Sequence, residues 1–181
     1  GGPDAYETMM KGLEDIPVGS DGLITLPYIA GERTPINDPK AKGMIFGLSM
    51  QHTRAHIYHS ALESIGYSIA NHLAIFRENG AAPKRIFAAG GGTKNPIWMQ
   101  IIADITGEEI HTANVTIGAA YGDALMAAIA TGHLSKFADI RNYITEGVSY
   151  KPNAENHEKY QKYYKIFNRL YEATKDMMHE L

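Results

Sequence analysis

The chain has 181 residues, 44% of them hydrophobic and 20% charged, which is enough for one domain with a well-buried core. Its net charge of −3, without a basic run, argues against nucleic acid as a partner. The absence of cysteine excludes disulfides and zinc–thiolate sites, and no apolar run reaches membrane-spanning length. Without a signal peptide either, the sequence predicts a single domain over residues 1–181 that works in the cytoplasm without a membrane partner.

The first part of the chain predicts two short strands joined by a polar loop. Residues 23–29 form an apolar run in which Pro27 indicates an edge strand or an irregularity, and residues 43–48 form a second strand between glycines. The loop between them contains Arg33. Two roles remain open for this side chain, namely contact with a phosphate or carboxylate in a ligand cleft, or a surface ion pair.

A long amphipathic helix follows, with Ser49 as its expected N-cap and residues 79–80 as its end. His52, His56 and His59 fall on one face of this helix, at a spacing that metal ligands can have. No partner acid is obvious at matching spacing. We therefore favour histidines that pack or cap the helix, and we predict no metal site here.

Residues 85–107 carry the strongest local pattern, a strand followed by three glycines and a helix. Residues 86–89 are an apolar strand, residues 90–92 are all glycine, and Asn95 and Pro96 are a good N-cap and first helical residue. Glycines let the backbone approach a ligand, and a helix start offers free N–H groups to an anion such as phosphate. A tight turn alone would also explain the glycines, and the stretch is neither a Walker loop nor a dinucleotide fingerprint.

The rest of the chain continues the alternation of elements. It predicts a short strand at 109–112, a helix of small residues at 117–131, an extended loop at 141–151, and a tyrosine-rich helix at 153–181. Asp104 must be hydrogen-bonded if it is buried. Asp123 is either a buried anchor or faces a ligand cleft. The alternation of strands and helices is typical of the α/β class.

Three separated stretches carry the motifs of one family. The first is GLITLPYIAGERTPINDPKAKG at residues 22–43, and the second is GMIFGLSMQHTRAHIYHSALE at residues 43–63. The third is the triple-glycine stretch with Asn95, Gln100, Ala103 and Asp104, followed by Gly118, Ala119 and Ala120. Taken together, they resemble the C-terminal domain of the FGGY carbohydrate kinases, and most of all the pentulose (xylulokinase-like) branch.

This resemblance implies an actin-like ATPase (ribonuclease H-like) fold, the C-terminal half of a two-domain sugar kinase. It implies transfer of the γ-phosphoryl group of ATP, with Mg²⁺, to the hydroxyl of a sugar, most fittingly a pentulose such as xylulose. It assigns nucleotide binding to the loop residues Gly90, Gly91, Gly92 and Thr93, and to Asn95.

The resemblance also implies that important parts of the enzyme lie outside this chain. The N-terminal domain and the catalytic base, an aspartate, are expected upstream of Gly1, so no catalytic residue is assigned here and the fragment alone is expected to be inactive. An isolated half should expose apolar surface and self-associate, for instance as a homodimer. The alternative is a non-catalytic actin-like module that binds nucleotide or a protein partner.

Overall fold

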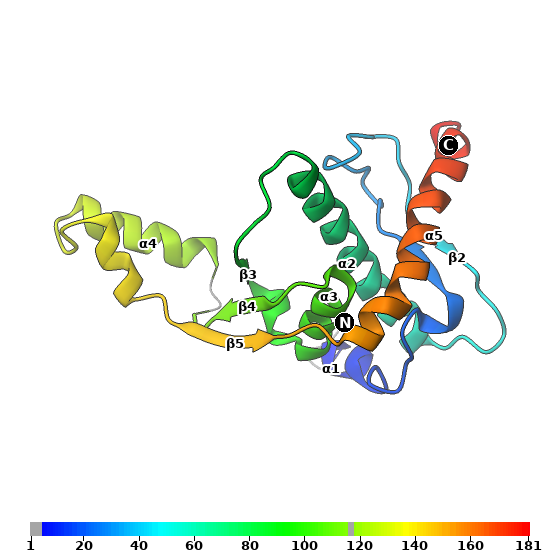
Figure 1. Ribbon diagram of the computed structural model, residues 1–181, viewed down its shortest axis with the longest axis horizontal. Helices are drawn as coiled ribbons and strands as arrows, with labels where there is room; N and C mark the ends of the chain where they lie inside the picture. The colour runs from blue at the N-terminus through cyan, green and yellow to red at the C-terminus, as the bar shows by residue number, and fades with distance from the viewer. Residues whose placement is uncertain (1–4, 116–117) are drawn as a thin grey trace.

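A computed structural model describes residues 5–115 and 118–181, as helices packed around two small sheets (Figure 1). Its helices and strands are α1 (Ala5–Met10), β1 (Ile24–Leu26), β2 (Met44–Phe46), α2 (Arg54–Glu78), β3 (Ile86–Ala88), α3 (Pro96–Thr106), β4 (Ile110–Ala113), α4 (Ala119–Ala130), β5 (Glu146–Tyr150) and α5 (Ala154–His179). Three short 3-10 turns are η1 (Ser20–Gly22), η2 (Gly91–Lys94) and η3 (Phe137–Asn142). The predicted α/β class is confirmed. The expected start of the small-residue helix at Ile117 lies outside the described residues.

The strands form one two-stranded and one three-stranded sheet. β1 and β2 pair antiparallel, with Thr25 opposite Ile45. In the other sheet, β3 runs parallel to β4, and β5 pairs antiparallel with β4. The sequence predicted only an extended loop at β5. The side chains of that strand are almost all exposed, so it lacks the apolar alternation by which a strand is predicted, and its pairing with β4 defines it.

Two boundaries differ from the sequence prediction for local reasons. The first strand ends at Leu26 because Pro27 follows and cannot donate to a ladder. The long helix α2 begins at Arg54, so the expectation that Ser49 is its N-cap was wrong. Thr53 is the N-cap, and it forms a capping box with His56, whose Nδ1 accepts from the Thr53 backbone N–H. A histidine is an unusual residue at the N3 position of such a box, where Glu or Gln is typical, which is why the pattern escaped prediction.

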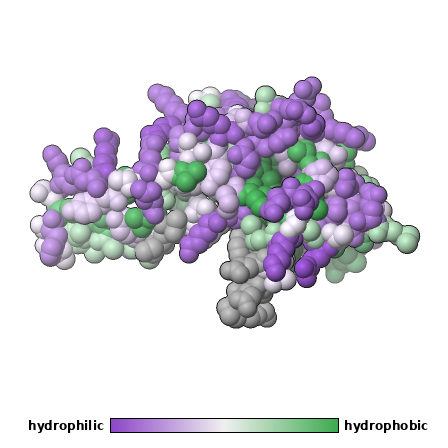
Figure 2. Space-filling view, turned by 90° about the horizontal axis from the view of Figure 1, so that it is seen from below, coloured by the Kyte–Doolittle hydropathy of each residue, from purple (hydrophilic) through white to green (hydrophobic). Residues whose placement is uncertain are grey.

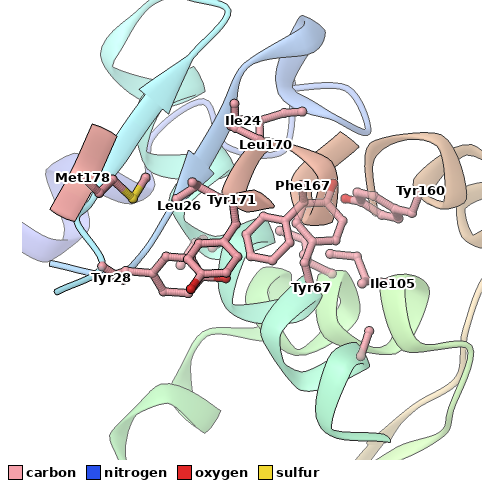
Figure 3. Close-up of a cluster of buried hydrophobic side chains, with 14 of the residues drawn as sticks. Ile24, Leu26, Tyr28, Tyr67, Ile105, Tyr160, Phe167, Leu170, Tyr171 and Met178 are labelled. Atoms are coloured by element: carbon pink, nitrogen blue, oxygen red, sulfur yellow. The ribbon is translucent and has the colours of Figure 1, made fainter. Parts of the chain in front are cut away.

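The main core lies where α5 crosses α2, α3 and β1 (Figure 3). The apolar stripe of α5 supplies Tyr160, Phe167 and Tyr171, all of them buried. Tyr28 of the first strand region meets the ring of Tyr171 edge-on at 5.5 Å, and Tyr67 of α2 lies 5.2 Å from Phe167. Such aromatic pairs add to the stabilisation from buried area. Among the described residues, no helix is both long and apolar enough to cross a bilayer.

A buried carboxylate joins α3 to the start of α5. Asp104 is 3% exposed, and its Oδ1 accepts hydrogen bonds from the Asn153 backbone N–H at 2.8 Å and from Gln100 Nε2 at 2.7 Å. Its Oδ2 accepts from Asn156 Nδ2 at 2.8 Å. This confirms the prediction that a buried Asp104 is hydrogen-bonded. Asn153 is the N-cap of α5, so the carboxylate fixes where that helix begins.

The helix α4 belongs to an arm that projects from the body (Figure 1). Leu125 is its one buried residue, and Met126 is 54% exposed. Figure 2 shows pale and green apolar atoms along this arm, at the left of the molecule. Asp123 on this helix is exposed, so its predicted role as a buried anchor was wrong, and its place in a ligand cleft stays a prediction.

Replacement of Asp104 by alanine should destabilise the fold by about 1–3 kcal/mol, because it leaves buried donors on α3 and α5 unpaired. Asp104→Asn is the matched control. Asparagine keeps the shape of the side chain and one acceptor oxygen, so this substitution should lower the free energy of unfolding by less than Asp104→Ala does. Urea unfolding followed by circular dichroism measures both, and an Asp104→Ala stability equal to that of the unaltered chain would contradict the role of this anchor.

Candidate functional site

The turn between β3 and α3, here called the glycine turn (Gly90 to Gly92), presents bare backbone to solvent. Gly90 has φ of 99° and ψ of −173°, a conformation that favours glycine. A Cβ built on Gly90 or on Gly91 would meet no other atom within 4 Å, and only Gly90 of these two has a positive φ. Thr93 closes the turn by donating its hydroxyl to the Gly90 carbonyl at 2.7 Å. The open side of the turn can therefore be approached by another molecule.

Asn95 fixes the end of this turn to the start of α3. Its side chain is fully buried, and its Oδ1 accepts from the Trp98 backbone N–H at 3.1 Å, which confirms its predicted role as the N-cap of α3. Its Nδ2 donates to the sulfur of Met10 at 3.2 Å. Direct contact with a nucleotide would require this side chain to leave its buried position, so that contact stays a prediction.

A pocket of about 460 Å³ opens beside the glycine turn. Its walls come from the ends of β3 and β4, from α4, and from Ile144, and they are apolar or glycine except for Tyr121. Gly118 brings the start of α4 against the turn, since a Cβ there would lie 3.8 Å from the Gly90 Cα. Tyr121 donates its hydroxyl to the Tyr143 carbonyl at 3.1 Å and so ties α4 to the segment that bears Ile144.

The lining of this pocket decides what it can hold. It contains no charged side chain, while exposed backbone of the glycine turn stands at its edge. Such a site suits a flat, largely apolar ring system whose polar or anionic part extends to the backbone N–H groups. The sequence predicted the glycine turn but not the opposite wall of the pocket, which α4 forms. The run of small residues in α4 was the available signal, because small residues at Ala119 and Gly122 leave this space open.

Arg33 lies in a different part of the molecule. It is exposed and does not line the pocket beside the glycine turn. Its loop is closed by paired backbone hydrogen bonds between Glu32 and Asp38, and Asp38 is tied to α5. The Asp38 Oδ2 accepts from His179 Nε2 at 2.7 Å and from the Tyr171 hydroxyl at 2.8 Å. The structure thus fixes this loop against the end of α5, and the contact of Arg33 with a ligand stays a prediction.

His52, which precedes α2, and His56 and His59 within it hold a turn of the chain rather than form a ligand set. His56 Nε2 lies 3.1 Å from Asp21 Oδ2, and His52 Nε2 lies 3.4 Å from the Asp21 carbonyl. The Nδ1 atoms of both histidines accept backbone N–H groups, those of Thr53 and Ser49. Within residues 5–115 and 118–181, no three histidine or acidic side chains lie together so that they could hold a metal ion.

The third histidine belongs to a buried serine, histidine and glutamate cluster. Ser20 Oγ donates to Glu63 Oε2 at 2.8 Å and lies 2.9 Å from His59 Nδ1. The other oxygen of Glu63 accepts from the Gly19 backbone N–H at 2.7 Å. All three side chains are at most 4% exposed, so no substrate can reach the hydroxyl. The cluster instead holds a turn in which Ser20 has a φ of 49°, in the left-handed region.

The fold is that of an α/β domain of the actin-like ATPase type, and comparison with known proteins identifies its family. Residues 4–131 match the family described as FGGY family of carbohydrate kinases, C-terminal domain. The chain therefore belongs to the FGGY family of carbohydrate kinases.

Individual relatives cover nearly the whole chain. It is 32% identical to the xylulose kinase of Bacillus subtilis over 175 residues, which are 96% of this chain and 35% of that protein. It is 31% identical to the gluconokinase of Bacillus licheniformis over 176 residues, 97% of this chain and 34% of the relative. The crystal structure of xylulose kinase from Rhodospirillum rubrum superposes with a TM-score of 0.83 and 32% identity, over 98% of this chain and 36% of that one. The chain thus spans about a third of the length of these relatives.

Asp38, which ties the Arg33 loop to α5, should affect the stability of the protein at acidic pH. The hydrogen bond from His179, with those from Tyr171 and Lys40, lowers the pKa of Asp38 from its ordinary 3.8 to about 2. A carboxyl whose pKa is lowered by folding stabilises the fold while it is ionised. That contribution is complete above about pH 4 and is lost as the pH falls towards about 2.

Asp38→Asn should therefore lower the melting temperature at neutral pH, and the difference from the unaltered protein should shrink between about pH 4 and about pH 2. Thermal melts across this range measure it. Asp15→Asn, at an exposed position, serves as the control. A difference between Asp38→Asn and the unaltered protein that is the same at every pH would contradict the assignment.

Proposed function

We propose that this chain is the ATP-binding half of a carbohydrate kinase, which transfers the γ-phosphoryl group of ATP to a sugar hydroxyl. The observation that carries the proposal is the glycine turn with open space above Gly90 and Gly91, at the edge of an apolar pocket of about 460 Å³. Membership of the FGGY family supports the same conclusion. We place the adenine ring in the pocket, between α4 and the strand ends.

The backbone of the glycine turn, with Thr93, then lies where the polar part of the nucleotide leaves the pocket. Backbone N–H groups can bind ribose or phosphate oxygens without a side chain in the way. Asn95 belongs to the site through its cap on α3, which fixes the end of the turn. Phosphoryl transfer depends on positioning and charge stabilisation, so a rigid turn of this kind contributes by fixing the nucleotide.

Other parts of the reaction are assigned outside this chain. We propose that Mg²⁺ arrives on the phosphates of ATP, since Mg²⁺ binds phosphates and few protein ligands, and the described residues offer no acidic cluster for it. The aspartate base and the main sugar contacts belong to the upstream part of the protein, so the chain alone should not phosphorylate a sugar. We further place the reaction in the cytoplasm.

The sugar is proposed from the relatives. The relatives named above are a xylulose kinase, whose substrate is a pentulose, and a gluconokinase. A pentulose such as xylulose fits best because the loop at residues 31–35 resembles the pentulose branch. The alternative function is a non-catalytic actin-like module. An upstream domain that carries a phosphate-binding loop and an aspartate would favour the kinase, and its absence would favour the module.

Gly91 offers the sharpest test of the nucleotide site. A side chain there has room in the fold, so Gly91→Val should leave the melting temperature nearly unchanged. It would fill the space above the turn that the nucleotide needs. In the longer protein that contains this chain, we expect the KM for ATP to rise about tenfold or more, with the KM for the sugar unchanged.

Steady-state kinetics with each substrate varied, alongside thermal melts, gives the answer. Gly91→Ala is the graded control and should have a smaller effect. If the KM for ATP stays at its original value in Gly91→Val, the turn is only a connection and the proposed nucleotide site is wrong.

The isolated chain should also self-associate, in the simplest case as a homodimer. Leu48 is 64% exposed and Met50 is fully exposed beside the unpaired edge of β2, and the arm of α4 exposes further apolar side chains. Exposed apolar surface favours association in water. Sedimentation velocity at increasing concentration measures it. A strictly monomeric species over the whole range would contradict the expectation, and Leu48→Lys should weaken the association.

A further inference from the structure

We propose that Trp98 is a positioning residue for the nucleotide, because the edge of its indole contacts Gly92 and so fixes the position of the glycine turn. The inference rests on the proposed nucleotide site. Trp98 is the single tryptophan of the chain and lies in the first turn of α3, three residues after the N-cap. It does not line the pocket, so its effect on a ligand would pass through Gly92.

The contact between Trp98 and Gly92 leaves no spare space. A Cβ built on Gly92 would lie 2.6 Å from the Trp98 Cζ3 atom and 3.2 Å from Cε3, and the φ of Gly92 is not in the left-handed region. Glycine is therefore required at this position by the ring beneath it rather than by backbone conformation. The neighbouring Gly91 has no such contact. The indole thus supports one defined residue of the turn.

Trp98 is held in place by two sets of contacts. Its backbone N–H donates to Asn95 Oδ1, which fixes the start of α3. Its side chain packs against both apolar clusters of the domain. A group held in this way moves little, so the Gly92 backbone resting on it is held as well. The position of the turn is consequently coupled to the packing of α3.

The indole nitrogen indicates that Trp98 acts through the size of its ring and not through a hydrogen bond. Trp98 Nε1 is buried and has no hydrogen-bond partner among the described residues. The Cε3–Cζ3 edge that touches Gly92 lies on the side of the indole away from this nitrogen. A buried unpaired donor is unfavourable, and phenylalanine would avoid it. Phenylalanine, however, is too short to bring a ring edge to the same place under the turn.

A structural role in the core and a positioning role predict different outcomes. If Trp98 only fills the core, Trp98→Phe changes stability and leaves the affinity for ATP as it was. If it positions the turn, Trp98→Phe weakens ATP binding about tenfold, with little effect on kcat or on the KM for the sugar. A methyl group on Gly92 would point toward the vacated space, so the further change Gly92→Ala should restore part of the lost affinity.

The experiment is a double-mutant cycle of Trp98→Phe and Gly92→Ala in the longer protein that contains this chain. Thermal melts and the dissociation constant for Mg-ATP, from isothermal titration calorimetry, are measured for all four proteins. We expect Gly92→Ala to destabilise the unaltered protein, where it meets the indole, and to be tolerated beside Trp98→Phe. Gly91→Ala serves as the control in the melts and should show no coupling with Trp98→Phe.

The outcomes separate this inference from the proposed function. If the unaltered protein binds Mg-ATP and Trp98→Phe binds it equally well, the positioning role is overturned while the nucleotide site stands. Additive effects of the two changes on affinity would also overturn it. If the unaltered protein does not bind Mg-ATP, the proposed function is contradicted and the positioning role falls with it. Restored affinity in the double variant supports the proposal.

Discussion

The carboxylate of Asp104 is the interaction on which the rest of this domain depends. It accepts hydrogen bonds from Gln100 on its own helix and from Asn153 and Asn156 at the start of α5. The start of α5 is therefore fixed against α3 by one buried carboxyl group. Because α3 begins directly after the glycine turn, these hydrogen bonds also fix the helix to which the turn is attached. The same hydrogen bonds thus contribute to the stability of the fold and to the geometry of the candidate site.

Three short-range contacts shape the glycine turn at the start of α3. Asn95 caps α3, Trp98 lies beneath Gly92, and Thr93 closes on the Gly90 carbonyl. Each contact spans only a few residues of sequence, yet together they leave the backbone at Gly91 open on its outer side. The second wall of the pocket comes from α4, which contacts little of the core, so the two sides of the site differ in how firmly the described part of the chain holds them.

Local signals in the sequence predicted the glycine turn, the helix α3 with its Asn95 cap, and the long helices, because caps, glycines and apolar spacing act within a few residues. The buried hydrogen bonding of Asp104 was also predicted as a condition of its burial. What could not be predicted depends on distant partners. The strand β5 has no apolar pattern and is defined by β4, and the link of Asp38 to His179 joins residues 141 positions apart. The sequence favoured packing or capping roles for His52, His56 and His59, but it could not show that Asp21 lies beside the first two of them.

The central claim is that the glycine turn and its adjoining pocket hold the nucleotide. Amide NMR of the isotopically labelled protein, titrated with Mg-ATP, tests it directly because it reads each backbone N–H without substitution or turnover. The account predicts saturable shifts of the Gly91, Gly92 and Thr93 amides together with those of Ala119 and Gly122 on the opposite wall. Shifts confined to residues away from this pocket, for example in the loop of Arg33, would contradict it.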